Sequence, residues 1–185
     1  TIYQKIFHDG IHSLLIAGLP SSGKTTILRD VCRQLGNKYK VSLIDERGEI
    51  GAVYKGVPQN DVGINTDVFD GYDKSKGIET AIRVMSPQII VCDEIGNESD
   101  SNALMLAINS GVKIIATVHA DTIENILAKS FNISCFEYIA FLDTVNIGIV
   151  KKILRTDEIV KGSRVWIDNN DNSNDRKLFF SRIEQ

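Results

Sequence analysis

The sequence lacks an excess of basic residues. Its 185 residues contain 21 lysines and arginines against 24 aspartates and glutamates, which leaves a net charge of −3 and a pI near 5.6. Such a chain has no overall positive field of the kind that drives binding to nucleic acid regardless of base sequence. A dedicated DNA-binding function is therefore disfavoured, and nucleic acid is not expected as a partner.

Long hydrophobic runs are missing as well. A helix that spans a bilayer needs about 18 to 20 consecutive apolar residues. The longest candidate stretch, residues 139–150, is interrupted by Asp143 and Asn146. We expect no direct membrane span, so that any attachment to a membrane would be through a partner protein.

Cysteine is scarce, and Cys32, Cys92 and Cys135 are the three in the chain. Their number is odd, and each lies inside an apolar segment without the spacing of metal ligands. We therefore predict buried thiols in a reducing cytosol. A chain of this length forms one α/β domain that buries about 70% of its unfolded surface, so no disulfide is needed.

Residues 18–26 read GLPSSGKTT, and they follow an apolar run and precede a helical pattern. This is the context of a loop that holds a nucleoside triphosphate. Gly18 and Gly23 let backbone N–H groups curl around a phosphate, and the following helix directs its positive end at the anion. Lys24 would contact the β- and γ-phosphates, and Thr25 would offer its hydroxyl to Mg²⁺. A chance turn between a strand and a helix is the alternative. The predicted nucleotide-binding residues are Gly18, Leu19, Pro20, Ser21, Ser22, Gly23, Lys24, Thr25 and Thr26.

The alternation of apolar runs with helical patterns predicts an α/β fold, with a mostly parallel sheet flanked by helices. We expect strands over 11–17, 40–44, 89–92 and 112–117, strand-like stretches within 145–154, and helices over 24–35, 78–85, 100–110 and from 121 onward. Residues 51–75 have no clear period and predict a long loop, which in a compact domain is usually functional. We assign residues 1–160 to the core and residues 161–185 to a C-terminal β-hairpin of the same domain, with strands over 164–168 and 177–180.

Two carboxylates, Asp93 and Glu94, follow the apolar run 89–92. Ligands bind beyond the carboxyl ends of parallel strands, so we expect both side chains to face the phosphate loop. Asp93 would hold Mg²⁺ opposite Thr25, and Glu94 would orient or deprotonate the attacking water. The alternative is an acidic turn or helix cap. A hydrolase is favoured over a small-molecule kinase, because residues 48–82 contain no arginine for a lid.

Two further polar clusters end predicted strands and should lie along the same edge: residues 45–47, which read Asp-Glu-Arg, and residues 117–119, which read Thr-Val-His. Glu46 could polarise water or the solvent bound to Mg²⁺, and His119 could sense the γ-phosphate through a hydrogen bond. The alternatives are ordinary. A charged turn after a strand is often only solvated, and a single histidine is often structural.

Five motifs occur in order over about residues 10–160: GLPSSGKTT, VSLIDERGEI, GVPQNDVGINTDVFDG, IRVMSPQIIVCDEIG and GVKIIATVHA. Together they resemble the stage III sporulation protein AA family, in the type II/type IV secretion ATPase group. The resemblance implies a RecA-like P-loop NTPase core, with ATP and Mg²⁺ as its ligands. It also implies functional roles for Asp45, Glu46 and His119. The group generally carries Gly-Glu where this chain has Asp93-Glu94. The chain therefore departs from the group at Asp93, toward the ordinary P-loop pattern, and keeps the glutamate at Glu94.

The resemblance further implies a Mg-dependent ATPase that works as a homo-hexameric motor. It would be cytoplasmic and peripheral at the mother-cell face of the outer forespore membrane, where it would act with membrane-anchored components of a channel during endospore formation. Family members have an N-terminal domain before this core, so we expect the sequence to be part of a longer chain. Related motors neutralise the phosphates with arginines from that domain or from the loop before the third strand. Here Arg47 and Arg83 are the nearest candidates, and we expect weak or no ATPase activity from the isolated chain. A RecA-like nucleic-acid motor and a nucleotide-binding scaffold are the alternatives.

Overall fold

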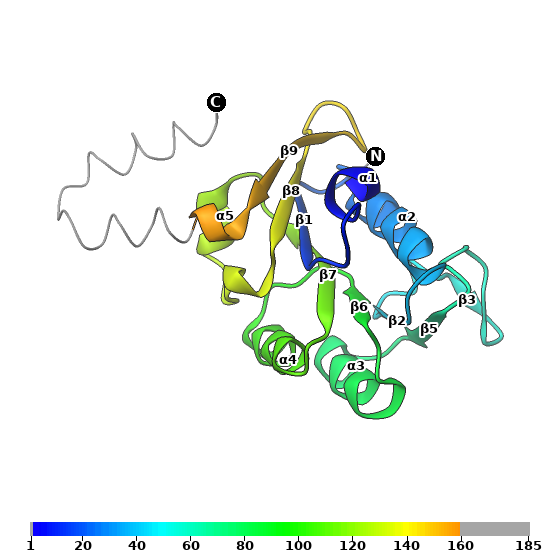
Figure 1. Cartoon of the computed structure of the whole chain (residues 1–185). Coiled ribbons are helices and arrows are strands. Elements are labelled where there is room, and N and C mark those ends of the chain that lie inside the picture. Colours follow the sequence, from blue (N-terminus) through cyan, green and yellow to red (C-terminus); the bar gives the residue numbers. More distant parts are fainter. Residues whose placement is uncertain (1, 160–185) are drawn as a thin grey trace, which may run out of the picture.

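Buried strands rich in Val, Ile and Leu form the centre of the protein, whose computed structural model describes residues 2–159 (Figure 1). The main sheet has seven strands in the order β5-β2-β6-β7-β1-β8-β9. Every neighbouring pair is parallel except β8 and β9, which are antiparallel. The strands are β1 (Leu14–Gly18), β2 (Val41–Asp45), β5 (Thr66–Asp70), β6 (Ile89–Cys92), β7 (Lys113–His119), β8 (Tyr138–Leu142) and β9 (Val150–Arg155).

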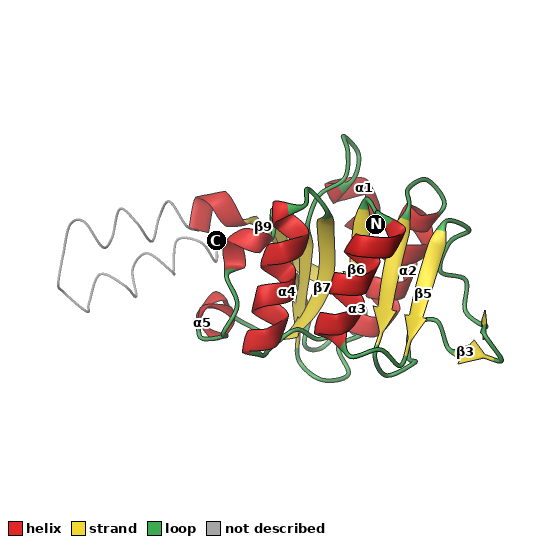
Figure 2. Cartoon of the chain, turned by 90° about the horizontal axis from the view of Figure 1, so that it is seen from below, coloured by secondary structure: helices red, strands yellow, loops and turns green. Residues whose placement is uncertain are grey.

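Helices cover both faces of the sheet, as the two views show (Figure 2). The first face packs against α1 (Ile2–Ile6) and α2 (Lys24–Gly36), with Leu28 and Val31 of α2 in one hydrophobic cluster. A second cluster on the other face contains residues of five short elements. These are α3 (Lys74–Thr80), the π-helical η1 (Ala81–Met85), α4 (Glu98–Asn109), α5 (Ile123–Leu127) and the 3₁₀ turn η2 (Ile133–Cys135).

A glycine lets helix α3 pack directly against β2. A Cβ atom on Gly77 would come within 2.7 Å of Ile44 Cγ2 on β2. Asp73 caps the start of α3 by accepting a hydrogen bond from the Lys76 N–H. The close packing and the cap together bring the first residue of α3, Lys74, to the carboxyl end of β2 and β6, where it is buried.

The α/β fold class predicted from the sequence is confirmed, and the antiparallel pair β8–β9 forms a hairpin at the C-terminal end of the sheet. The expected hairpin strands 164–168 and 177–180, and the extension 161–185, lie outside the described residues. The predicted loop 51–75 contains β5 and a small antiparallel pair, β3 (Val53–Tyr54) and β4 (Val57–Pro58). Within 145–154, only the part from Val150 onward is a strand.

The three cysteines are free thiols and are buried, as predicted. Burial raises the pKa of Cys32 and of Cys92 to about 12. Among residues 2–159, no helix combines the length and the hydropathy that crossing a membrane requires.

Candidate nucleotide site

The phosphate loop connects the buried strand β1 to helix α2. Gly23 precedes α2 with φ 93° in the left-handed region, which a glycine adopts without strain. No side chain caps this start of α2 in the described structure. The first N–H groups of a helix have no partner within the helix, so here they are available to an anion in the loop.

The loop is tightly wound around its own side chains. A Cβ atom on Gly18 would collide with Ser22 Oγ, so this position needs a glycine. Ser22 Oγ is buried and has no hydrogen-bond partner among the described residues. Lys24 Nζ donates to the carbonyl oxygens of Gly18, at 3.0 Å, and of Leu19, at 2.8 Å. An ammonium held only by carbonyls, beside an orphaned hydroxyl and an uncapped helix, fits a polyphosphate.

Strand register places the acidic pair near this loop. Gly18 on β1 is paired with His119 on β7, and Ala116 on β7 is paired with Cys92 on β6. The carboxyl ends of β1, β7 and β6 are therefore consecutive along one edge of the sheet. Burial lowers the pKa of Lys24, and the charges of Glu94 and Asp93 act in the opposite direction.

Thr117 fixes the orientation of the acidic pair. Its buried Oγ1 donates to Asp93 Oδ1 at 2.8 Å and accepts from the Glu94 backbone N–H at 2.7 Å. The same Asp93 oxygen accepts from the Glu94 N–H at 2.8 Å. With its carboxylate held in this way, Asp93 stays at the end of β6 and leaves its second oxygen for another partner.

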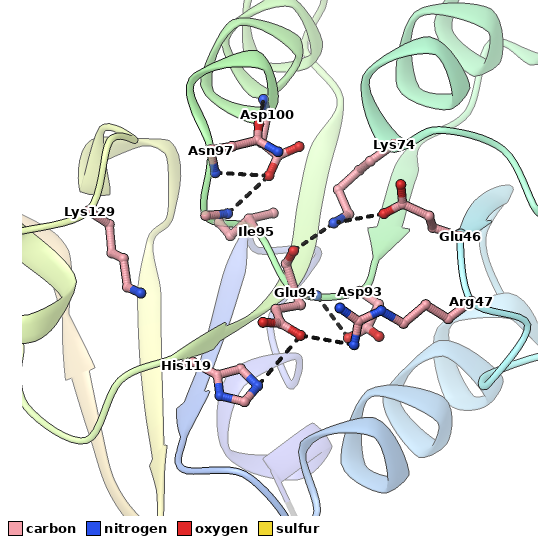
Figure 3. Close-up of a pocket in the computed structure, with 11 residues that line it drawn as sticks. Glu46, Arg47, Lys74, Asp93, Glu94, Ile95, Asn97, Asp100, His119 and Lys129 are labelled. Atoms are coloured by element: carbon pink, nitrogen blue, oxygen red, sulfur yellow. Dashed lines mark hydrogen bonds and ion pairs between the residues drawn. The ribbon is translucent and has the colours of Figure 1, made fainter.

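Glu94 lies in a pocket of about 260 Å³ (Figure 3). Its Oε2 is 3.3 Å from Arg47 Nη1 and 3.5 Å from His119 Nε2. From the other side, Lys74 Nζ donates to the Glu94 carbonyl oxygen at 2.6 Å and lies 3.5 Å from Glu46 Oε2. The pocket therefore gathers charged groups from the ends of β2, β6 and β7 and from the start of α3.

Asp45 organises the turn that carries Glu46 and Arg47. Its buried carboxylate accepts hydrogen bonds from three backbone N–H groups, those of Glu49, Ile50 and Gly51. Arg29 on α2 also holds this turn through the carbonyl oxygens of Glu49 and Ile50. The carboxylate of Asp45 is thus engaged in the backbone, and its role in the acidic motif is to position its neighbours.

The structure brings most of the predicted site residues together along one edge. Glu46, Arg47, Asp93, Glu94 and His119 all line the pocket beside the phosphate loop. Arg83 does not join them. It is exposed on η1, which leads into the amino end of β6 and so lies toward the opposite edge of the sheet.

The donor set suits a magnesium ion that is bound largely through phosphate and water. Among the described residues, no cluster of three or more His, Cys, Asp or Glu side chains is placed to hold a metal by itself. Mg²⁺ commonly uses only one or two protein carboxylates together with substrate phosphates. Thr25, half-buried in the first turn of α2, and Asp93 at the end of β6 fit that pattern.

Sequence reasoning gave no role to three residues of this site. Lys74 and Thr117 bind Glu94 or Asp93 directly, and Lys129 extends toward the pocket from the side opposite Glu46 and Arg47 (Figure 3). The cap residue Asp73 is a signal that α3 begins at Lys74. The polar run Thr117–His119 at a strand end indicates that Thr117 lies near the site. Neither this run nor the cap at Asp73 predicts which side chains are in contact.

Proteins of similar sequence show the family of the chain. A family model described as sporulation stage III, protein AA matches residues 2–161. Stage III sporulation protein AA of Bacillus subtilis is 39% identical over 130 residues, which cover 67% of this chain and 42% of that protein. The protein SEEDLING PLASTID DEVELOPMENT 1 of Arabidopsis thaliana is 32% identical over 123 residues, which cover 64% of this chain and 18% of that protein. The chain therefore spans less than half the length of these relatives.

Solved structures of similar fold include two ATPases and a pilus retraction motor. The Legionella pneumophila ATPase DotB superposes with a TM-score of 0.62 at 19% identity, over 91% of this chain and 52% of DotB. The VirB11 ATPase of the Brucella suis type IV secretion system gives 0.59 at 14% identity, over 80% of this chain and 49% of VirB11. The pilus retraction motor PilT gives 0.55 at 16% identity, over 72% of this chain and 43% of PilT. These likenesses confirm the RecA-like fold, and the family model and the Bacillus relative place the chain in the sporulation stage III protein AA family.

Proposed function

We propose that this chain is the Mg-dependent ATPase core of a motor of the secretion-ATPase type. The observation that supports this most directly is the pairing of Gly18 with His119, which sets the phosphate loop next to the strand ends that carry His119, Asp93 and Glu94. The fold and the family are consistent with such an activity. In this proposal the polyphosphate of ATP lies between the start of α2 and the pocket around Glu94.

Binding of the triphosphate would fall to the loop and to α2. Lys24 would exchange the carbonyls of Gly18 and Leu19 for phosphate oxygens, and the free N–H groups of α2 would surround the anion. Thr25 and Asp93 would hold Mg²⁺, which when bound supplies positive charge to the phosphates. Thr117 keeps Asp93 in the orientation that this role needs.

Glu94 would accept the proton of the attacking water, because its carboxylate lines the pocket between Arg47 and His119. Arg47 and His119 both contact Glu94 Oε2, and both carry donors suited to a γ-phosphate. We propose that they divide their contacts between Glu94 and that phosphate. Loss of the γ-phosphate would return Arg47 to Glu94 and shift the turn of residues 46–51, which is the kind of ordering change that drives motors. Glu46, held by Lys74, would polarise a second water.

The biological setting is inferred from the family. The Bacillus relative is named for stage III of sporulation, and the structures of similar fold include ATPases of secretion and pilus systems. We propose a homo-hexamer that docks on membrane-anchored components of a channel between mother cell and forespore. It would act in the cytoplasm, at the mother-cell face of the outer forespore membrane.

The test separates binding from turnover. Glu94→Gln keeps the size of the side chain but removes the base, so we expect ATP affinity to stay within about threefold while turnover falls by about 10² to 10⁴. Lys24→Ala should abolish nucleotide binding in calorimetric titration. The matched control is Glu98→Gln, an exposed glutamate in the first turn of α4, which should change neither quantity. Because the isolated chain is expected to hydrolyse ATP weakly or not at all, turnover is measured on the full-length, ring-assembled protein. Unchanged hydrolysis by the assembled Glu94→Gln protein would overturn the assignment.

A further inference from the structure

The turn between β8 and β9 lies against the phosphate loop. The Gly148 N–H donates to the Ser22 carbonyl oxygen at 2.9 Å. A Cβ atom placed on Gly23 would be 3.0 Å from the Gly148 nitrogen and 3.4 Å from Ile147 Cγ2. Residues 143–149, here called the β8–β9 turn, are therefore in van der Waals contact with the last residues before α2.

Internal hydrogen bonds hold this turn in one shape. Asp143 Oδ1 accepts from the N–H groups of Val145, at 2.7 Å, and Asn146, at 3.2 Å. The Asp143 N–H donates to the Ile149 carbonyl oxygen at 2.8 Å and so closes the base of the turn. The hydrogen bonds from the Val145 N–H and from the side chain and N–H of Asn146 lower the pKa of Asp143. The turn is thus an ordered surface before any ligand binds.

The turn presents aliphatic side chains to solvent. Val145 is 82% exposed, Ile147 73% and Ile149 54%. Leaving three branched aliphatic side chains in water is unfavourable, since each would gain stability from burial. A group of them beside a phosphate site points to an apolar part of the ligand that occupies that site.

The order of strands decides which part of the ligand this is. The acidic pair directly follows β6, which is two strands from β1 on one side, whereas β8 is the neighbour of β1 on the other side. If the terminal phosphate lies at Glu94, as the proposed function requires, the rest of the nucleotide extends across the phosphate loop toward β8. We propose that the β8–β9 turn forms a wall for the base, with Ile147 and Val145 against the face of the purine ring. The wall contacts the face of the ring, so it binds an aromatic base without reading its edge.

The test compares ATP with inorganic tripolyphosphate, which has the phosphates but no base. In the double variant Val145→Ser/Ile147→Ser, calorimetry with Mg²⁺ should show ATP affinity about tenfold weaker and tripolyphosphate affinity unchanged. Ile64→Ser is the matched control, because Ile64 is 87% exposed and lies in the loop before β5, at the other end of the sheet. It should leave both affinities as they are.

The outcomes distinguish this inference from the proposed function on which it rests. Equal losses for ATP and tripolyphosphate, or no loss for either, would overturn the base wall. So would a variant that changed only self-association, because the turn would then contact a second copy. If the native protein bound tripolyphosphate as tightly as ATP, the proposed phosphate site would stand and the proposed base wall would be contradicted. If the native protein bound neither ATP nor tripolyphosphate, both the proposed function and the base wall would be contradicted.

Discussion

Lys74 carries a buried ammonium whose partners, among residues 2–159, are oxygens of Glu46 and Glu94. It is 6% exposed, donates to the Glu94 carbonyl and lies beside the Glu46 carboxylate. A buried charge is stable only when it is paired, so this lysine and the two glutamates constrain one another. The position of the Glu94 carboxylate therefore depends on a side chain that makes no contact with it.

We predict that Lys74→Met slows turnover more than it weakens binding. Release of the Glu94 backbone would misplace the proposed base, and a displacement of about 1 Å can reduce a rate by about 10²-fold. Steady-state kinetics should give a kcat lowered about 10- to 100-fold and a KM changed far less. Lys76→Met, two residues along on the exposed side of α3, is the control. Partial rescue of kcat by Lys74→Arg would separate positioning from general destabilisation, and an equal rise in KM would contradict the prediction.

The site could be predicted from the sequence mainly because its polar motifs come at the ends of strands. The strands β1, β2 and β6 are fully buried, and β1 and β6 are continuous apolar runs. Each of the three leads into a polar motif that the parallel topology brings to one edge of the sheet. The sequence did not predict β5 because this edge strand, TDVFD, is largely polar and only partly buried. Contacts such as that of Lys74 with Glu94 arise from packing between segments 20 residues apart, which no local pattern encodes.

The opposite edge of the sheet carries a separate charged cluster that ties the N-terminal segment to β8. His12 Nδ1 lies 2.7 Å from Glu137 Oε2, and His12 Nε2 lies 2.9 Å from Asp9 Oδ1. Lys113 Nζ is 2.6 Å from the other Glu137 oxygen. Burial lowers the pKa of His12, but its hydrogen bonds to Glu137 and Asp9 raise it, and the net effect is a pKa above the ordinary value.

We predict that His12 stabilises the fold only at lower pH. Its folded-state pKa is raised, so the stabilisation is complete below the unfolded pKa of about 6.5 and is lost as the pH rises through the folded value. His12→Gln should lower the free energy of unfolding by about 1 kcal/mol at pH 5.5 and by much less at pH 8.5. Urea denaturation of the native protein and the variant at both pH values measures this. A larger loss at pH 8.5 than at pH 5.5 would show the wrong sign, and nucleotide affinity should not change, since the cluster lies at the edge away from the phosphate loop.

The whole molecule places its arginines unevenly around the proposed site. Among the described residues that line the pocket there is one arginine, Arg47, and it is paired with Glu94. The other lining cations are lysines, Lys74 and Lys129, while Arg83 is exposed toward the opposite edge. Within residues 2–159, one copy of the chain thus offers few groups to neutralise a transferring phosphate. An arginine supplied from a second subunit can raise such a rate by about 10³ to 10⁵.

We therefore predict that Arg83, if it serves catalysis, acts on the site of a neighbouring subunit. Turnover per chain should rise with protein concentration, and Arg83→Ala should lower it only under conditions where rings form, by up to about 10³-fold. Mixing Arg83→Ala with Lys24→Ala gives the decisive measurement, because the first keeps an intact phosphate loop and the second keeps Arg83. Mixed rings should hydrolyse ATP faster than the sum of the two proteins assayed apart. Arg33→Ala, which changes an exposed arginine on α2 that is paired with Asp30, is the control and should leave the rate unchanged. A mixture that gave only the summed rates would assign the missing charge to Arg47 and the lysines of the same subunit.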